Sequence, residues 1–129
     1  MTTRIAIRKN LFEHEVICKC GCGFKTISAE LADKFQIARD YLKEAIIVSC
    51  GCRCLAHNTA ITGVKNSSHI SGKALDLTIS NPTKERLFKL SHALAWAGFR
   101  RIEINLQKRY VHVDVDHAKG DYFKIIGME

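Results

Sequence analysis

The sequence predicts an α+β fold in which a small antiparallel sheet packs against two main helices. Two segments repeat apolar residues at helical spacing, 29–44 and 82–97. Three segments alternate apolar and polar residues as strands do, 73–79, 101–105 and 110–116. A chain of 129 residues is long enough for one domain with a core of its own, so we expect a single domain over residues 1–129.

The first half of the chain is expected to contain an irregular segment, one long helix and several short elements. Residues 1–27 carry cysteines and glycines without a clear period. Ser28 then provides a hydroxyl N-cap for a helix over 29–44. The buried stripe of this helix is Leu31, Phe35, Ala38 and Leu42. Three short segments follow it: a buried strand at 46–48, a helix at 55–61 and a mostly polar loop at 62–68.

The second half is expected to supply the rest of the sheet and the second helix. In the strand at 73–79, Asp76 stands among apolar residues. Asn81 supplies the cap of the second helix, Pro82 occupies its first position and Gly98 ends it. The buried stripe of the second helix is Leu87, Leu90, Leu94 and Ala97.

A hairpin and one last strand complete the predicted fold. The strands at 101–105 and 110–116 are antiparallel and are joined by the loop 106–109. Directly paired residues of such strands point to the same side of the sheet. The predicted pairs are Asn105 with Tyr110 and Glu103 with His112. A final strand covers 122–126.

Composition and charge narrow the classes of function. Net charge is +7, from 20 Lys and Arg against 13 Asp and Glu, which favours an anionic partner such as a cell-wall polymer. A nucleic-acid module would show a basic stripe interleaved with aromatics, which only 99–101 and 108–110 approach, so we expect no nucleic-acid partner. The sequence offers neither a membrane span nor an apolar signal peptide. We therefore expect a protein that is made in the cytoplasm, and separately we expect a monomer.

Cysteines occur in two triplets of alternating spacing: Cys18, Cys20 and Cys22, and then Cys50, Cys52 and Cys54. In a reducing compartment such clusters indicate metal binding or free thiols, and outside it they indicate disulfides. Thiolates from both triplets would suffice for a closed zinc site that ties the N-terminal loop to the core. The Cys-x-Cys spacing differs from the Cys-x-x-Cys of zinc knuckles, so all three states remain alternatives here.

Two histidines and one aspartate form the candidate metal set. His112 lies on the face of its strand that also carries Asp114, opposite a face of valines. Asp76 is costly among its apolar neighbours unless it is paired or binds a cation, and His69 precedes it in a loop. Gly72 lets this loop approach a neighbouring backbone closely. Three protein ligands on zinc leave a fourth position open, which is the arrangement of a catalytic site.

These residues lie within longer motifs. Residues 66–76, Asn-Ser-Ser-His-Ile-Ser-Gly-Lys-Ala-Leu-Asp, resemble the Ser-x-His-x-x-Gly-x-Ala-x-Asp motif of the zinc D-alanyl-D-alanine carboxypeptidase family. This family also holds vancomycin-resistance D,D-dipeptidases and the L-alanyl-D-glutamate endopeptidases of phage endolysins. Residues 111–115 resemble its second ligand block, His-Val-Asp, and residues 48–58 are similar to its Ser-Gly-Tyr-Arg-(Cys)-x-x-His-Asn segment. The resemblance spans residues 12–116 and implies the fold that the family shares with the Hedgehog signalling domain.

The resemblance implies roles for five residues. Zinc would be held by His69, Asp76 and His112. Arg53 would be the catalytic group that meets a substrate carboxylate or peptide carbonyl, since its planar fork is always charged and binds bidentately. Ser67 would brace the metal loop and contribute to substrate binding.

Two residues are candidates for the general base. Many members of the family carry an acidic base three residues before the last histidine ligand, where this chain has Arg109. Asp114 follows His112 by two residues on the same face and has the motif resemblance, whereas Glu103 has the predicted pairing geometry. We favour Asp114, and its alternative role is to support His112 by hydrogen bonding.

The resemblance implies a zinc peptidase that hydrolyses peptidoglycan stem or cross-link peptides, as a D,D-carboxypeptidase or as an endopeptidase. It would serve in phage or prophage lysis and act at the cell wall or in the periplasm. The alternative is a non-catalytic zinc domain of the same fold that binds wall peptides or a protein partner, which the loss of the acid at position 109 supports. A third hypothesis is a cysteine-cluster nucleic-acid module that uses the basic surface.

Overall fold

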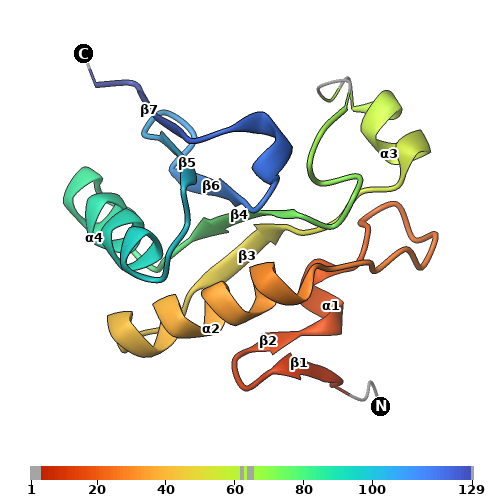
Figure 1. Ribbon diagram of the computed structural model, residues 1–129, viewed down its shortest axis with the longest axis horizontal. Helices are drawn as coiled ribbons and strands as arrows, with labels where there is room; N and C mark the ends of the chain where they lie inside the picture. Colours follow the sequence, from red (N-terminus) through yellow and green to blue (C-terminus); the bar gives the residue numbers. More distant parts are fainter. Residues whose placement is uncertain (1–3, 62, 64–65, 129) are drawn as a thin grey trace.

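The computed structural model describes residues 4–61, 63 and 66–128. In this part of the chain a five-stranded sheet runs in the order β3-β4-β6-β5-β7 (Figure 1). Its strands are β3 (Ile47–Cys50), β4 (Ala74–Thr78), β5 (Arg101–Asn105), β6 (Tyr110–Asp114) and β7 (Tyr122–Ile126). The two long helices are α2 (Ala29–Leu42) and α4 (Lys84–Trp96). The predicted α+β class is confirmed, and the sheet is antiparallel except for β7, which pairs with β5 in parallel.

The hydrophobic core lies between one face of the sheet and the two long helices. Apolar side chains of β4, β6 and β5 point to this face in two rows, Leu75 with Val113 and Ile102, and Leu77 with Val111 and Ile104. They pack against buried residues of α2 and α4, which include Leu31, Phe35, Leu87, Leu90 and Leu94. Because side chains alternate along a strand, the residues between these rows point to the opposite face, where polar groups gather.

Helix α4 begins two residues later than the sequence predicts. Thr83 is its N-cap, and the Oγ1 of Thr83 accepts from the N–H of Arg86 at 3.3 Å. The predicted cap, Asn81, has a positive φ of 51° and lies with Pro82 in the turn before the helix. Helix α2 begins as predicted, with Ser28 as its N-cap.

The N-terminal segment contains more regular structure than the irregular stretch predicted over 1–27. Its described elements are β1 (Ala6–Arg8), β2 (Leu11–Phe12) and α1 (Glu13–Val16). Leu11 and Val16 are fully buried in the core, so this segment adds a layer that the apolar pattern of the long elements does not reveal. Residues 17–28 contain neither helix nor strand.

The remaining short elements match the prediction in part. Helix α3 spans Leu55–Ala60, and a 3-10 turn, η1, spans His117–Lys119. The strand predicted as buried at 46–48 is the edge strand β3, and Ile47 is 46% exposed because β3 has a neighbour on one side only. Of the predicted loop 62–68, residues 62, 64 and 65 lie outside the described residues.

The predicted hairpin register is confirmed. Asn105 pairs with Tyr110, and Glu103 pairs with His112. The strand β6 ends at Asp114, two residues before the predicted end, and β7 occupies the predicted range. The hairpin therefore presents the residues of its polar face in the order that the sequence indicates.

Gly72 lets the loop before β4 dock on the segment before α2. Its φ is +69°, and a Cβ at this position would lie 2.3 Å from the carbonyl oxygen of Thr26. The carbonyl of Gly72 also accepts from the N–H of Ser28 at 2.8 Å. The close backbone approach predicted for this glycine is therefore confirmed.

We predict that Gly72→Ala lowers the free energy of unfolding by about 3 kcal/mol or more. The alanine Cβ would clash with the carbonyl oxygen of Thr26, and alanine also pays to adopt the left-handed conformation at this position. The matched control is Gly120→Ala, because Gly120 has a similar φ of +74° and nothing within 4 Å of a built Cβ. The free energy of unfolding of this control should fall by only about 1 to 2 kcal/mol, the cost of the left-handed conformation alone. Urea denaturation measures both changes, and equal losses would contradict the proposed close approach.

Candidate metal centre

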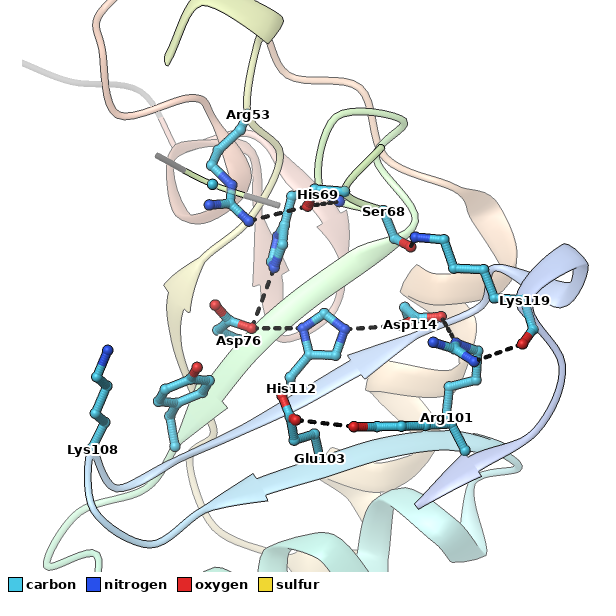
Figure 2. Close-up of a pocket in the computed structure, with 14 residues that line it drawn as sticks. Arg53, Ser68, His69, Asp76, Arg101, Glu103, Lys108, His112, Asp114 and Lys119 are labelled. Carbon is cyan, nitrogen blue, oxygen red and sulfur yellow. Dashed lines mark hydrogen bonds and ion pairs between the residues drawn. The ribbon is translucent and has the colours of Figure 1, made fainter. Parts of the chain in front are cut away.

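The polar face of the sheet carries three directly paired residues. Asp76 of β4 pairs with His112 of β6, which in turn pairs with Glu103 of β5. We call Asp76, His112 and Glu103 the cross-strand row. All three line a cavity of ≈ 620 Å³ (Figure 2). Three strands thus bring one imidazole and two carboxylates together on the face opposite the core.

His69 is held beside this row by the loop that precedes β4. Its Nε2 lies 3.3 Å from Oδ1 of Asp76, while its Nδ1 donates to the carbonyl of Gly51 at 2.6 Å. The carbonyl of His69 accepts from the N–H groups of Arg53 and Gly72 at 3.0 and 3.3 Å. His69 itself is 2% exposed, with one ring nitrogen secured by the backbone and the other directed at Asp76.

His112 shows the same division between its two ring nitrogens. Its Nδ1 lies 2.9 Å from Oδ1 of Asp76, the same oxygen that faces His69. Its Nε2 lies 2.8 Å from Oδ2 of Asp114. The two imidazoles stand edge to face, with ring centroids 5.3 Å apart. One oxygen of Asp76 is therefore the meeting point of both histidines, as Figure 2 shows.

Asp114 is buried and both of its oxygens are engaged. Its Oδ1 accepts from Nε of Arg101 at 2.7 Å and from the N–H of Asp116 at 3.1 Å. Burial raises the pKa of Asp114, but its hydrogen bonds with His112 and Asp116 and the charge of Arg101 outweigh burial and lower that pKa. The ionised carboxylate lies on the far side of the His112 ring from Asp76 (Figure 2).

The negative charge of Asp76 and the positive charges of the two protonated histidines stabilise one another. Burial by itself lowers the pKa of His69, but hydrogen bonds with Asp76 and Cys50 raise it to about 9. Burial raises the pKa of Asp76, yet the two histidines hold that pKa well below its usual range. The pKa of His112 is raised, since its bonds to Asp114 and Asp76 outweigh burial. A divalent cation at this point would take the place of the ring protons that the carboxylate otherwise stabilises.

Arg53 and Ser67 form the wall of the cavity next to His69. Oγ of Ser67 accepts from Nη2 of Arg53 and from the N–H of His69, both at 3.2 Å. Nε of Arg53 is buried and has no hydrogen-bond partner among the residues that the structure describes. An unpaired guanidinium N–H beside a cavity is costly, so it is available to an oxygen of a bound ligand.

Glu103 closes the cross-strand row on the side of β7. Its Oε1 accepts from the hydroxyl of Tyr122 at 3.2 Å. Glu103 is half-buried and lines the cavity, in contrast to Asp114, which is only 3% exposed. The two predicted base candidates therefore sit in different environments, one facing the cavity and one enclosed behind a histidine.

A model of the peptidase M15 family matches residues 9–114. The chain belongs to this family. The match contains His69, Asp76 and His112, so the resemblance drawn from the two motif blocks is confirmed. Members of the peptidase M15 family are zinc-dependent hydrolases of peptides, and the chain accordingly has a peptide as its substrate. No curated protein matches the chain.

In the described part of this peptidase M15 member, none of the helices has both the length and the apolar composition that a membrane crossing requires.

Cys50 offers a further donor atom beside His69 and Asp76 in this M15 member. Ligand atoms of Cys50, His69 and Asp76 all lie within 4.8 Å of one another. Cys50 Sγ, however, lies 3.9 Å from Nδ1 of His69, the nitrogen that already donates to Gly51. His112 instead directs Nδ1 at the same Asp76 oxygen as His69 Nε2.

Several residues of the cavity were not singled out from the sequence. Arg101 had a usable signal, because the predicted register continues to place it beside Asp114. Tyr122 and Lys119 had none, because they reach the cavity only through the crossover that makes β7 parallel to β5. Lys119 donates to Oγ of Ser68 at 2.9 Å and so helps to hold the loop of His69.

We predict a pH-dependent stability in the metal-free protein. The folded-state pKa of His69 is about 9, above the ordinary 6.5, so its protonation stabilises the fold. This stabilisation is complete below pH 6.5 and is lost as the pH rises through about 9. His112, whose pKa is also raised, contributes with the same sign.

Urea unfolding in the presence of a chelator measures this slope. His69→Gln should flatten it, whereas His14→Gln, at an exposed histidine of α1, should leave it unchanged. A wild-type protein whose metal-free stability is constant from pH 6.5 to 9 would contradict the arrangement around Asp76.

Proposed function

We propose that this chain is a zinc metallopeptidase that hydrolyses peptidoglycan stem or cross-link peptides, with zinc held by His69, Asp76 and His112. The observation that carries the proposal is the convergence of both imidazoles on Oδ1 of Asp76. Each ring uses its other nitrogen for a fixed hydrogen bond, to Gly51 or to Asp114. Such outer contacts are typical of histidines that bind a metal, because they set the tautomer and the ring orientation.

The donor set fits zinc. Two imidazole nitrogens and one carboxylate oxygen are ligands that catalytic zinc takes, with bonds of about 2.0–2.2 Å. In a tetrahedron of that size two donors are about 3.3 Å apart. His69 Nε2 and His112 Nδ1 lie 3.3 and 2.9 Å from the Asp76 oxygen. The set faces a cavity, which leaves room for a substrate at the fourth position.

We assign the general base to Glu103 and a positioning role to Asp114. When bound, zinc would polarise the scissile carbonyl and lower the pKa of water toward about 7. Glu103 takes the proton of the attacking water at its carboxylate and returns it to the leaving amine. The hydroxyl of Tyr122 holds one oxygen of Glu103, and the pairing with His112 keeps the carboxylate beside the metal set. Asp114 is less suited to this step because Arg101 and His112 occupy both its oxygens.

Arg53 is the proposed substrate anchor. Its buried Nε, which has no partner among the residues described, and its contact with Ser67 place a charged donor on the wall beside His69. A stem peptide carries free carboxylates, and a guanidinium binds a carboxylate with two parallel hydrogen bonds. Lys108 also lines the cavity and adds positive charge for such a ligand.

We propose D,D-carboxypeptidase or endopeptidase activity on wall peptides, at the cell wall, in phage or prophage lysis.

We predict that chelation abolishes hydrolysis of purified murein and that added zinc restores it. His112→Ala should lose activity and should not be rescued by zinc, since one of three donors is gone. His92→Ala, at an exposed histidine of α4, serves as the control and should retain activity. Mass spectrometry of the products separates release of a terminal D-alanine from cleavage of a cross-link. Activity that survives both the chelator and His112→Ala would refute a zinc mechanism.

A matched pair of amide substitutions distinguishes the general base, Glu103, from the residue that positions His112, Asp114. Glu103→Gln should lower kcat by about 10² to 10⁴-fold while zinc content stays unchanged. Asp114→Asn should instead weaken zinc affinity by about 10 to 100-fold, because it loosens the orientation of His112. Zinc titration and kinetics on one stem-peptide substrate give both numbers. If Glu103→Gln keeps full kcat, Glu103 is not the base; if the wild type binds stem peptide but never cleaves it, the non-catalytic alternative holds.

A further inference from the structure

The six cysteines occupy three different environments, although the sequence shows only two triplets. Cys52 is buried, and its Sγ donates to the carbonyls of Val16 and Phe24 at 3.0 and 3.1 Å. Cys50 lies beside His69. The other four cysteines form what we call the cysteine cluster: Cys18, Cys20, Cys22 and Cys54. All four sulfur atoms of the cluster lie within 4.8 Å of one another.

The spacing of these sulfurs matches a tetrahedral metal site. The Sγ atoms of Cys18 and Cys20 are 3.5 Å apart, and those of Cys20 and Cys54 are 3.6 Å apart. Zinc–sulfur bonds of about 2.3 Å in a tetrahedron separate the sulfurs by about 3.8 Å. A disulfide joins two sulfurs and gives no reason for four to converge. Convergence of all four is what a single shared cation requires.

Backbone donors also surround the sulfurs. Three of the four accept an N–H group: Cys18 from Cys54 at 3.4 Å, Cys22 from Phe24 at 3.4 Å and Cys54 from His57 at 3.3 Å. Hydrogen bonds to a ligand atom favour its charged form and fix its direction. The fold therefore presents these sulfurs as oriented acceptors, in the way that a thiolate ligand needs.

The backbone conformation of the loop between Cys18 and Phe24 brings its cysteine sulfurs together. Gly21 and Gly23 both have φ of +86°, a conformation that side chains rarely adopt. The N–H of Cys18 donates to the carbonyl of Phe24 at 2.7 Å, which closes the loop. Alternate residues of the Cys-Lys-Cys-Gly-Cys run thus turn their sulfurs inward toward Cys54, which lies far along the chain.

We propose that the cysteine cluster is a second, structural zinc site that ties the N-terminal loop to the segment carrying Arg53. Four thiolates fill the coordination shell of zinc and leave no open position, so the site has no reaction of its own. Cys54 is the N-cap of α3 and follows Arg53 directly. Zinc at the cluster would hold the backbone of Arg53, whose N–H donates to the carbonyl of His69 at 3.0 Å.

Metal counting tests the proposal independently of catalysis. The wild-type protein, purified under reducing conditions, should contain two equivalents of zinc per chain. The double variant Cys20→Ser/Cys22→Ser should contain one and unfold at a lower temperature. Cys52→Ser is the matched control and should keep both ions, because its hydroxyl retains the buried hydrogen bonds. His69→Ala/His112→Ala should also keep one ion, so a failure of the proposed peptidase site is distinguishable from a failure of this one.

Cobalt substitution and alkylation add two further readouts, and in the wild type neither depends on a cysteine variant that folds. Cobalt in the wild type and in His69→Ala/His112→Ala should show the intense thiolate charge-transfer band of a four-sulfur site, and Cys20→Ser/Cys22→Ser should lose it. In the wild type, zinc should protect all four cluster thiols from iodoacetamide, and EDTA should expose them. A zinc count that Cys20→Ser/Cys22→Ser leaves unchanged, no zinc in His69→Ala/His112→Ala, iron in place of zinc at the cluster, disulfides among the cluster cysteines, or alkylation unaffected by EDTA would each overturn the proposal.

Discussion

The backbone register between β4, β6 and β5 decides which side chains meet at the cavity. With Asp76 opposite His112 and His112 opposite Glu103, one polar line crosses the sheet while Leu75, Leu77 and their partners fill the core on the other face. A shift of one residue in either pairing would turn the cavity-facing side chains into the core. The apolar rows therefore hold the site in place, because the hydrophobic cost of a slip falls on every residue of the strand.

In each of the two histidines, the ring nitrogen that faces away from Asp76 already has a hydrogen-bond partner. The backbone of Gly51 holds His69, and the carboxylate of Asp114 holds His112. Burying that carboxylate is costly unless it is paired, and Arg101 at 2.7 Å provides the pair. Position 109 holds an arginine, and Glu103 on the neighbouring strand pairs with His112 and lines the cavity.

The long helices and strands were predictable from the sequence because their apolar residues recur with a clear period. The pairing of His112 with Glu103 in the cross-strand row was also predictable, because a short hairpin loop allows few strand registers. The pairing of Glu103 with His112 and the close approach at Gly72 followed from that reasoning. Contacts between distant segments were not predictable. The cap of α4 moved to Thr83 because its hydroxyl reaches a free N–H, which Asn81 in its left-handed turn does not.

The grouping of the cysteines in the fold is a further example of contacts between distant segments that the sequence could not predict. Spacing alone groups Cys54 with Cys50 and Cys52, whereas the fold places it with the N-terminal cysteines and leaves Cys52 among backbone carbonyls. The joining of these segments depends on α1, whose residue Val16 accepts from the N–H of Cys52 at 2.9 Å. A helix of so few residues leaves almost no periodic signal, so its role in bringing the cysteines together became visible only in three dimensions.

Anomalous diffraction at the zinc edge, from crystals of the zinc-loaded protein, tests the central claim most directly. We expect a peak bonded to Nε2 of His69, to the carboxylate of Asp76 and to Nδ1 of His112, with distances of about 2.0–2.2 Å. A zinc peak bonded to Nδ1 of His69 and to Cys50, with His112 outside its coordination shell, would contradict the claim, as would the absence of any zinc beside Asp76.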